Sequence, residues 1–236
     1  MASRAAAFFN KAEARDKFSK SVQYLSRLMM FATVNLNPDI SKRFELLFKG
    51  MADARKLFRL FKWVNEYQKT MEFLDQPPAD WDEKDLILNI LARVSFSVYW
   101  IFDNLFILSK LKVIRQNTDG FRVASAFFWW LGLLFNLVIA FLKLSTLKIE
   151  ENSLIKLSEQ NPEKSGALKD RFSLIKKIRN TQYRAIIKSL GDLITSAAGW
   201  GIGEQFGMHF NDAHIGIGGS VSALITCWEL YPEAQK

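Results

Sequence analysis

Apolar and polar positions alternate with a helical period through the first third of the chain. Large apolar residues recur every three or four positions between Phe18 and Met29, which predicts a helix over residues 8–34. The segment "LNPD" at 36–39 ends that helix, because proline cannot continue it. A second helix is expected from about residue 40 to residue 74, followed by a proline-rich, charged linker at 75–84.

The strongest amphipathic pattern lies within the second predicted helix, in the stretch "ADARKLFRLFKWVNE". At 100° per residue, large apolar side chains fill one side of residues 51–66 and basic side chains fill the other. Membrane insertion is predicted for Met51, Leu57, Phe58, Leu60, Phe61 and Val64, and contact with anionic lipid for Arg55, Lys56, Arg59 and Lys62. Taken alone, the pattern also fits a helix that packs on a protein core or one that grips nucleic acid.

Two segments further along are apolar enough to lie inside a membrane. Residues 86–108 contain only two charged side chains, Arg93 and Asp103, which lie ten positions apart and therefore about 15 Å apart along a helix. Residues 123–142 contain no charge, and twenty helical residues span roughly 30 Å, the thickness of a bilayer's hydrocarbon core. We expect both segments to be membrane helices; the alternative is a helix buried in a large soluble core.

Small residues recur near the C-terminal end. A polar, basic helical hairpin is expected at 143–188, and small residues then follow at four-residue spacing from Gly191 to Gly207, with Thr195 as the second of them. Such spacing lets two helices approach closely in a membrane. Helix packing and oligomerisation are therefore predicted for Gly191, Gly199, Gly203, Gly207, Gly216 and Ser220. A loop is the alternative for residues 199–207. Embedded helices at 190–207 and 213–230 would raise the number of membrane helices from two to four.

Charge is distributed unevenly along the 236 residues. The formal net charge is +8, yet Lys and Arg outnumber Asp and Glu by six in residues 143–188 and fall short by four in residues 189–236. A basic chain with an acidic, glycine-rich end is not typical of a nucleic-acid binder. Basic segments beside apolar runs fit an anionic membrane surface better.

Residues that would carry catalysis or bind a metal are scarce. The two histidines, His209 and His214, are five positions apart and have no evident third ligand. Cys227 is the single cysteine and has no partner that would make it a nucleophile. The stretch "GWGIGEQFG" lacks the spacing of a nucleotide-binding glycine loop. We therefore expect no enzyme activity, no cofactor and no metal.

Four segments, taken in order, resemble the peroxin-eleven family, the peroxisomal membrane protein 11 group. They are "ARDKFSKSVQYLSRLM" (14–29), "ARKLFRLFKWV" (54–64), "DNLFILSKL" (103–111) and "GIGGSVSALITCW" (216–228). The resemblance implies a multi-helix peroxisomal membrane protein that elongates and proliferates the organelle ahead of fission. It also implies an inserted N-terminal amphipathic helix, self-association and recruitment of fission-machinery proteins. The part of this sequence that matches the inserted helix is 51–66.

These observations predict an all-α, multi-helix integral membrane protein. Residues 1–85 would form a cytosolic helical region and residues 86–236 a membrane-embedded region that carries the basic insert. The expected location is the peroxisomal membrane, or that of a specialised glycosome, with both termini facing the cytosol. The expected function is membrane remodelling by insertion into anionic lipid and homo-oligomer formation. The alternatives are a channel for small metabolites, with Arg93 and Asp103 in its lining, and a soluble scaffold that binds helices or RNA.

Overall fold

The structure is a computed structural model that describes residues 2–115, 117–160 and 165–232. Throughout these ranges the regular structure is helical, without strands, which confirms the all-α prediction. Within the same ranges two helices, Glu83–Lys110 and Thr118–Gln160, are long and apolar enough to cross a membrane. They contain the two segments that the hydropathy of the sequence singled out.

The helices follow one another closely along the chain. Their bounds are α1 Ala2–Phe9, α2 Ala12–Thr33, α3 Pro38–Phe58, α4 Lys62–Asp75, α5 Glu83–Lys110, α6 Thr118–Gln160, α7 Ser165–Trp200, α8 Ile202–Gln205 and α9 Asp212–Leu230. The predicted basic hairpin at 143–188 is built by the second half of α6 and the first half of α7. The turn expected at 161–166 falls largely outside the described residues.

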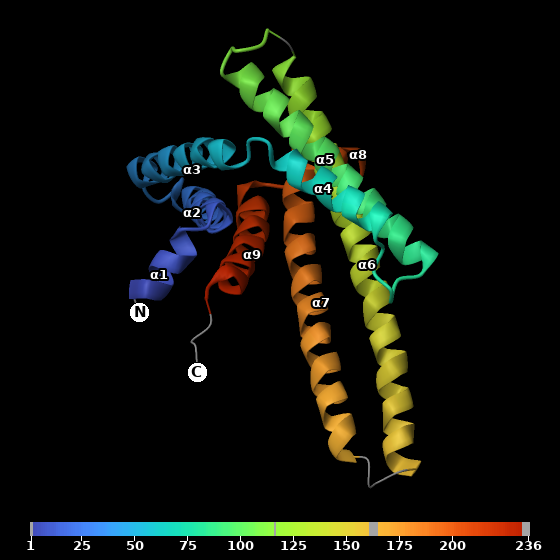
Figure 1. The fold of residues 1–236 in the computed structure, drawn as a ribbon. Coiled ribbons are helices and arrows are strands. Elements are labelled where there is room, and N and C mark those ends of the chain that lie inside the picture. Colours follow the sequence, from blue (N-terminus) through green and yellow to red (C-terminus); the bar gives the residue numbers. More distant parts are fainter. Residues whose placement is uncertain (1, 116, 161–164, 233–236) are drawn as a thin grey trace.

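The helices pack in a ring. Along the ring, α5 packs on α6, α6 on α7, α7 on α9, α9 on α2, α2 on α3, and α4 on α5 (Figure 1). Because α3 and α4 are consecutive in the chain, these contacts close around a central space. The far ends of α6 and α7 extend together beyond the other helices as a long pair (Figure 1). The predicted regions 1–85 and 86–236 are therefore packed against each other through α2 on α9 and α4 on α5.

Side-chain caps mark where several helices begin. The side chain of Asn37 accepts a hydrogen bond from the backbone N–H of Ile40 at the start of α3, where Pro38 occupies the first turn. Asn211 accepts bonds from two backbone N–H groups at the start of α9, and the backbone N–H of Asn211 donates to His214 Nδ1 at 3.3 Å. His214 thus completes a capping box.

The predicted single helix over residues 40–74 is wrong, because it is broken in the middle of the amphipathic stretch. α3 ends at Phe58 and α4 begins at Lys62, with Phe61 in the left-handed region at φ 59°. The side chain of Asn104 on α5 accepts a hydrogen bond from the Phe61 N–H at 2.9 Å and donates one to the Arg59 carbonyl at 3.3 Å. Polar backbone groups left free by the break are thus satisfied by another helix.

The predicted helix over residues 190–207 is also wrong beyond its first half. α7 ends at Trp200, and Gly201 and Gly207 take positive φ angles of 84° and 69°. Glycine tolerates such angles because it has no Cβ. Of the small residues predicted to pack helices, Gly203 lies in the short helix α8 and Gly207 in the following turn, so the loop alternative holds there.

The remaining small residues pack helices within one chain. α7 and α9 cross at Gly191 and Gly218, where a Cβ on either glycine would meet the backbone of the other. Gly216 lies against Leu28 of α2, where a Cβ would come within 3.0 Å of that residue. Ser220 is buried in α9, and a Cβ on Gly199 would meet Ala126 of α6 at 3.1 Å. Close packing is therefore intramolecular at these positions, and their role in oligomerisation stays a prediction.

Gly218→Ala should destabilise the crossing of α7 and α9. A Cβ at this position would lie 2.5 Å from the Gly191 carbonyl oxygen, so the two helices would have to separate. Overpacking of this kind costs roughly 1–3 kcal/mol. Thermal unfolding of the purified protein in detergent micelles should show a lower melting temperature.

Gly50→Ala is the matched control. Gly50 lies inside α3, with no atom within 4 Å of its ideal Cβ position. Alanine there should raise stability by about 0.5–1 kcal/mol, because glycine is a poor helix former. A Gly218→Ala variant that melts with the parent would contradict the close crossing.

Candidate functional site

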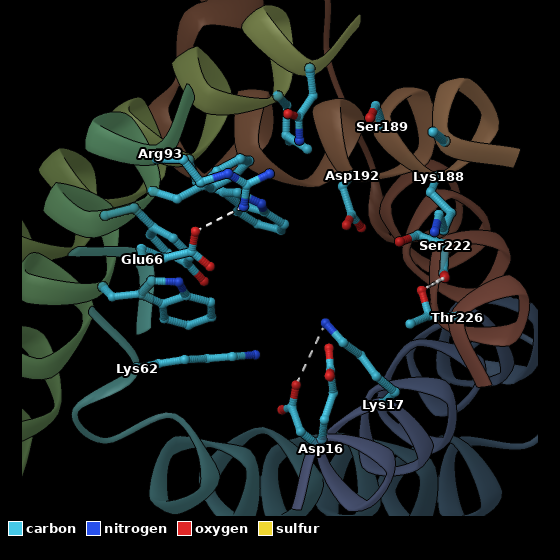
Figure 2. A pocket seen from close by; sticks show the side chains of 18 of the residues that line it. Asp16, Lys17, Lys62, Glu66, Arg93, Lys188, Ser189, Asp192, Ser222 and Thr226 are labelled. Carbon is cyan, nitrogen blue, oxygen red and sulfur yellow. Dashed lines mark hydrogen bonds and ion pairs between the residues drawn. The ribbon is translucent and has the colours of Figure 1, made fainter. Parts of the chain in front are cut away.

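A polar cavity occupies the centre of the ring. It has a volume of about 620 Å³ and is lined by side chains of α2, α3, α4, α5, α6, α7 and α9 (Figure 2). Its cationic lining residues are Lys17, Lys20, Arg55, Arg59, Lys62, Lys69, Arg93 and Lys188. Its carboxylate lining residues are Glu13, Asp16, Glu66 and Asp192. Aromatic rings, among them Trp100 and Trp129, complete the wall.

A buried ion pair joins α2 to α3. Arg55 Nε donates to Asp16 Oδ1 at 3.0 Å, and Arg55 Nη1 donates to Gln23 Oε1 at 2.7 Å. Burial alone would raise the pKa of Asp16, but the charges of Arg55 and then Lys17 outweigh it and lower the pKa to about 2. Asp16 is therefore an anion at neutral pH although its side chain is 2% exposed.

A second buried pair joins α2 to α7 and α9. Lys20 Nζ donates to Asp192 Oδ1 at 2.6 Å and to Ser222 Oγ at 3.0 Å. Both ionic side chains lie at the cavity wall. One lysine thus links three helices whose sequences are up to 202 residues apart.

The two charged residues within segment 86–108 of α5 pair with the N-terminal helices. Arg93 Nη1 donates to Glu66 Oε2 at 2.8 Å, and Arg59 Nη2 lies 3.4 Å from Asp103 Oδ1. Arg59 Nη1 also lies 3.4 Å from the hydroxyl oxygen of Tyr99. The two predicted intramembrane charges therefore find partners on α4 and at the end of α3.

The four basic residues of the amphipathic stretch face other protein groups. Arg55 and Arg59 form the pairs described above, and Lys62 extends into the cavity (Figure 2). Lys56 pairs with Asp53 and lies 5.7 Å above the ring of Phe106. The sequence predicted a basic outer face, whereas the structure places this face toward the ring's interior and α5. Contact of these residues with lipid stays a prediction.

The apolar side of the same stretch is exposed at the break between α3 and α4. We name the exposed side chains there the apolar turn: Leu57, Phe58, Leu60, Phe61 and Val64. Leu57 is 66% exposed and Phe61 is 69% exposed, while Met51 is half-buried. Large apolar side chains exposed so close together along the chain indicate a surface that something apolar covers.

Several cavity residues gave no usable sequence signal. Asp16, Lys17 and Lys20 read as the ordinary polar face of a helix, and Asp192 reads as a charge beside a glycine. Lys20 and Asp192 are 172 positions apart, so no local spacing connects them. The only available hint was that α2 carries charges of both signs close together.

Comparisons with known proteins find one family, and its matches cover nearly the whole chain. The model of the family described as Peroxisomal biogenesis factor 11 matches residues 2–231. The Peroxisomal membrane protein 11 homolog of Dictyostelium discoideum is 26% identical, over 93% of this chain and 90% of that protein. Peroxisomal membrane protein 11-5 of Oryza sativa subsp. japonica is 26% identical, over 97% and 92%. Peroxisomal membrane protein PMP27 of Saccharomyces cerevisiae is 22% identical, over 95% and 92%. No solved structure matches the chain significantly.

Asp16→Asn should remove the pH-dependent part of the stability that the α2–α3 ion pair contributes. The folded-state pKa lies below the usual 3.8, so ionised Asp16 stabilises the fold above pH 4 and loses this effect as the pH falls toward 2. The pH-dependent part of the free energy of unfolding is about 2 kcal/mol, because the pKa of Asp16 lies nearly two units below its ordinary value. Thermal melts of parent and variant should differ most at neutral pH and converge between pH 4 and pH 2. A difference that does not change with pH would contradict a charged Asp16.

Proposed function

Because the chain belongs to the Peroxisomal biogenesis factor 11 family, we propose that it is a peroxisomal membrane protein that remodels and elongates the organelle membrane ahead of fission. The observation that carries this proposal is the apolar turn, which presents large side chains to the surroundings beside two helices able to span a membrane. Inserted at the headgroup level of one leaflet, the turn would expand that leaflet and favour curvature.

Burial of the apolar side chains is the main driving force of insertion. Full burial of a Leu or Phe side chain contributes roughly 1.5–3 kcal/mol. A basic residue beside an anionic membrane surface contributes about 1 kcal/mol, and salt screens it. Insertion therefore depends more on Leu57, Phe58 and Phe61 than on any single basic residue.

The break at Phe61 provides a way for the amphipathic stretch to insert into a membrane. A non-glycine residue in the left-handed region costs roughly 1–2 kcal/mol. A continuous helix through residues 59–61 would remove this cost and give up the two hydrogen bonds with Asn104. A continuous helix would also bring the apolar side chains of residues 51–66 onto one face. The bent form is thus the resting state and the straight form the inserted state.

Self-association would concentrate many inserted apolar turns in one region of membrane. Fission-machinery proteins are the expected partners, by family resemblance, and the N-terminal helices would meet them on the cytosolic face. The oligomer and these partners belong to the proposal, as does the cytosolic orientation of both termini.

A conduit for small metabolites is the second candidate, and the central cavity favours it. Charged and amide side chains line a space enclosed in part by α5 and α6, each of which is long and apolar enough to span a membrane. Single-channel recordings of the purified protein in planar bilayers test this candidate. Stepwise currents in the parent would support conduction, and silent bilayers would remove it.

Phe61→Asp should abolish membrane tubulation in cells while the protein still reaches peroxisomes. The substitution places a charge in the most exposed side chain of the apolar turn, whereas α5 and α6 still anchor the chain. Ile149→Asp is the control, because Ile149 is similarly exposed at 68% but lies in the second half of α6. Normal tubulation by Phe61→Asp would remove the apolar turn from the mechanism.

A peptide of residues 51–66 tests the straight form directly. In water it should be largely unstructured, because a short helix needs its apolar face buried. On vesicles of anionic lipid its circular dichroism should show a helical content close to that of one continuous helix. Absence of any helical gain on such vesicles would contradict the inserted state.

A further inference from the structure

We propose that the central cavity binds a small anion that carries a phosphate group, at a site between Lys62, Arg93 and Lys17. This site goes beyond membrane remodelling and does not depend on the apolar turn. A volume of about 620 Å³ lies within the range of small-molecule sites. The charge, the unpartnered donors and the aromatic wall of the cavity specify the class of ligand.

Positive charge is in excess around the cavity. Eight cationic and four carboxylate side chains line it. Behind the wall, Asp103 pairs with Arg59, and Glu229 is shared by Lys188 and Arg184, which leaves an excess of at least two positive charges. An uncompensated charge in a partly enclosed space is costly unless a counter-charge enters. The cavity therefore favours an anionic occupant.

Lys62 is the centre of this excess. Its ammonium group extends into the open space (Figure 2) and lies 4.9 Å above the ring of Trp100. Among the residues that the structure describes, no carboxylate lies within ion-pair distance of it. Burial, followed by the charge of Lys17, lowers the pKa of Lys62 from 10.5 to about 8. Lys62 is thus a cation held without a counter-charge.

Neighbouring donors point to the same occupant. Lys17 extends into the cavity from the opposite side and is 3.8 Å from Asp16, a distance longer than a hydrogen bond (Figure 2). The Nε–H groups of Arg93 and Arg59 are buried without a hydrogen-bond partner in the described structure. Buried donors are rarely left unsatisfied, so each marks a place where an acceptor is missing.

Phosphate fits this set of donors better than a single carboxylate. A phosphate group carries nearly two negative charges and three strong acceptor oxygens, and lysine and arginine are its usual partners. Carboxylates line the cavity on both sides: Glu13 and Asp16 on α2, and Glu66, which is paired with Arg93, on α4. The ligand is placed among Lys62, Arg93 and Lys17, where Trp100 and Tyr99 offer faces for an organic ring.

Calorimetric titration of the purified full-length protein in phosphate-free detergent micelles tests the site. Two probes distinguish the source of the phosphate: inorganic pyrophosphate for a soluble anion, and phosphatidylinositol bisphosphate in mixed micelles for a lipid headgroup. Saturable binding of either probe supports the site and identifies its source. Absence of binding by both would overturn it.

Lys62→Gln should weaken binding about tenfold to a hundredfold, the loss expected for one charge-assisted contact. Lys62→Arg should retain binding, because it keeps the charge. Lys177→Gln is the matched control, since Lys177 is exposed on α7 and does not line the cavity. Equal affinity of Lys62→Gln and the parent would overturn the proposal.

Loss of binding by misfolding is separated from loss of the site in two ways. Lys62→Gln removes a desolvated charge, so the variant should melt no lower than the parent. Ala185→Trp fills the cavity from α7 without changing any charge and should also abolish binding. A folded Ala185→Trp variant that binds like the parent would place the anion outside the cavity. Tubulation by these variants is a separate measurement, so failure of the remodelling proposal leaves this test intact.

Discussion

The ring of helices depends on the requirement that a buried charge must have a partner. Asp16 on α2 is paired with Arg55 on α3, and Lys20, one turn later, is paired with Asp192 on α7. Removing one member of such a pair leaves the other charge uncompensated, which costs several kcal/mol. α2 therefore has one position that satisfies both pairs, between α3 on one side and α7 with α9 on the other. Glycines at the α7–α9 crossing allow the backbones to come close enough for this arrangement.

The same requirement connects the N-terminal helices to the helices able to span a membrane. Arg93 and Asp103 bring charges into α5, and both are neutralised from outside that helix, by Glu66 and Arg59. The amphipathic stretch therefore has two tasks in this structure. Its basic side chains neutralise or border the ring's interior, and its apolar side chains remain available to the surroundings. Movement of the stretch into a membrane would change the electrostatics of the cavity as well.

Helices were largely predictable here, and their breaks and partners were not. Apolar periodicity identifies α2 and α3, and long apolar runs identify α5 and α6. The apolar face that the sequence predicted for α2 is nevertheless exposed at Phe18, Leu25 and Met29. The break at Phe61 contradicts local propensity, since "RLFK" contains no glycine or proline; the hydrogen bonds with Asn104, 43 residues away, compensate it. Four-residue spacing of small residues continued past Trp200 and concealed the end of α7. The cavity was not predictable, because its charge pairs join residues up to 172 positions apart.

The length of α6 has a geometric consequence. Its 43 residues extend for roughly 65 Å, about twice the thickness of a bilayer's hydrocarbon core. If residues 123–142 fill that core, the charged second half of α6 stands in water together with the paired part of α7. Ion pairs such as Arg179 with Glu151 stiffen this pair. This helix pair projects some tens of ångströms from the membrane, and it would set the distance at which a neighbouring molecule or membrane first contacts the protein.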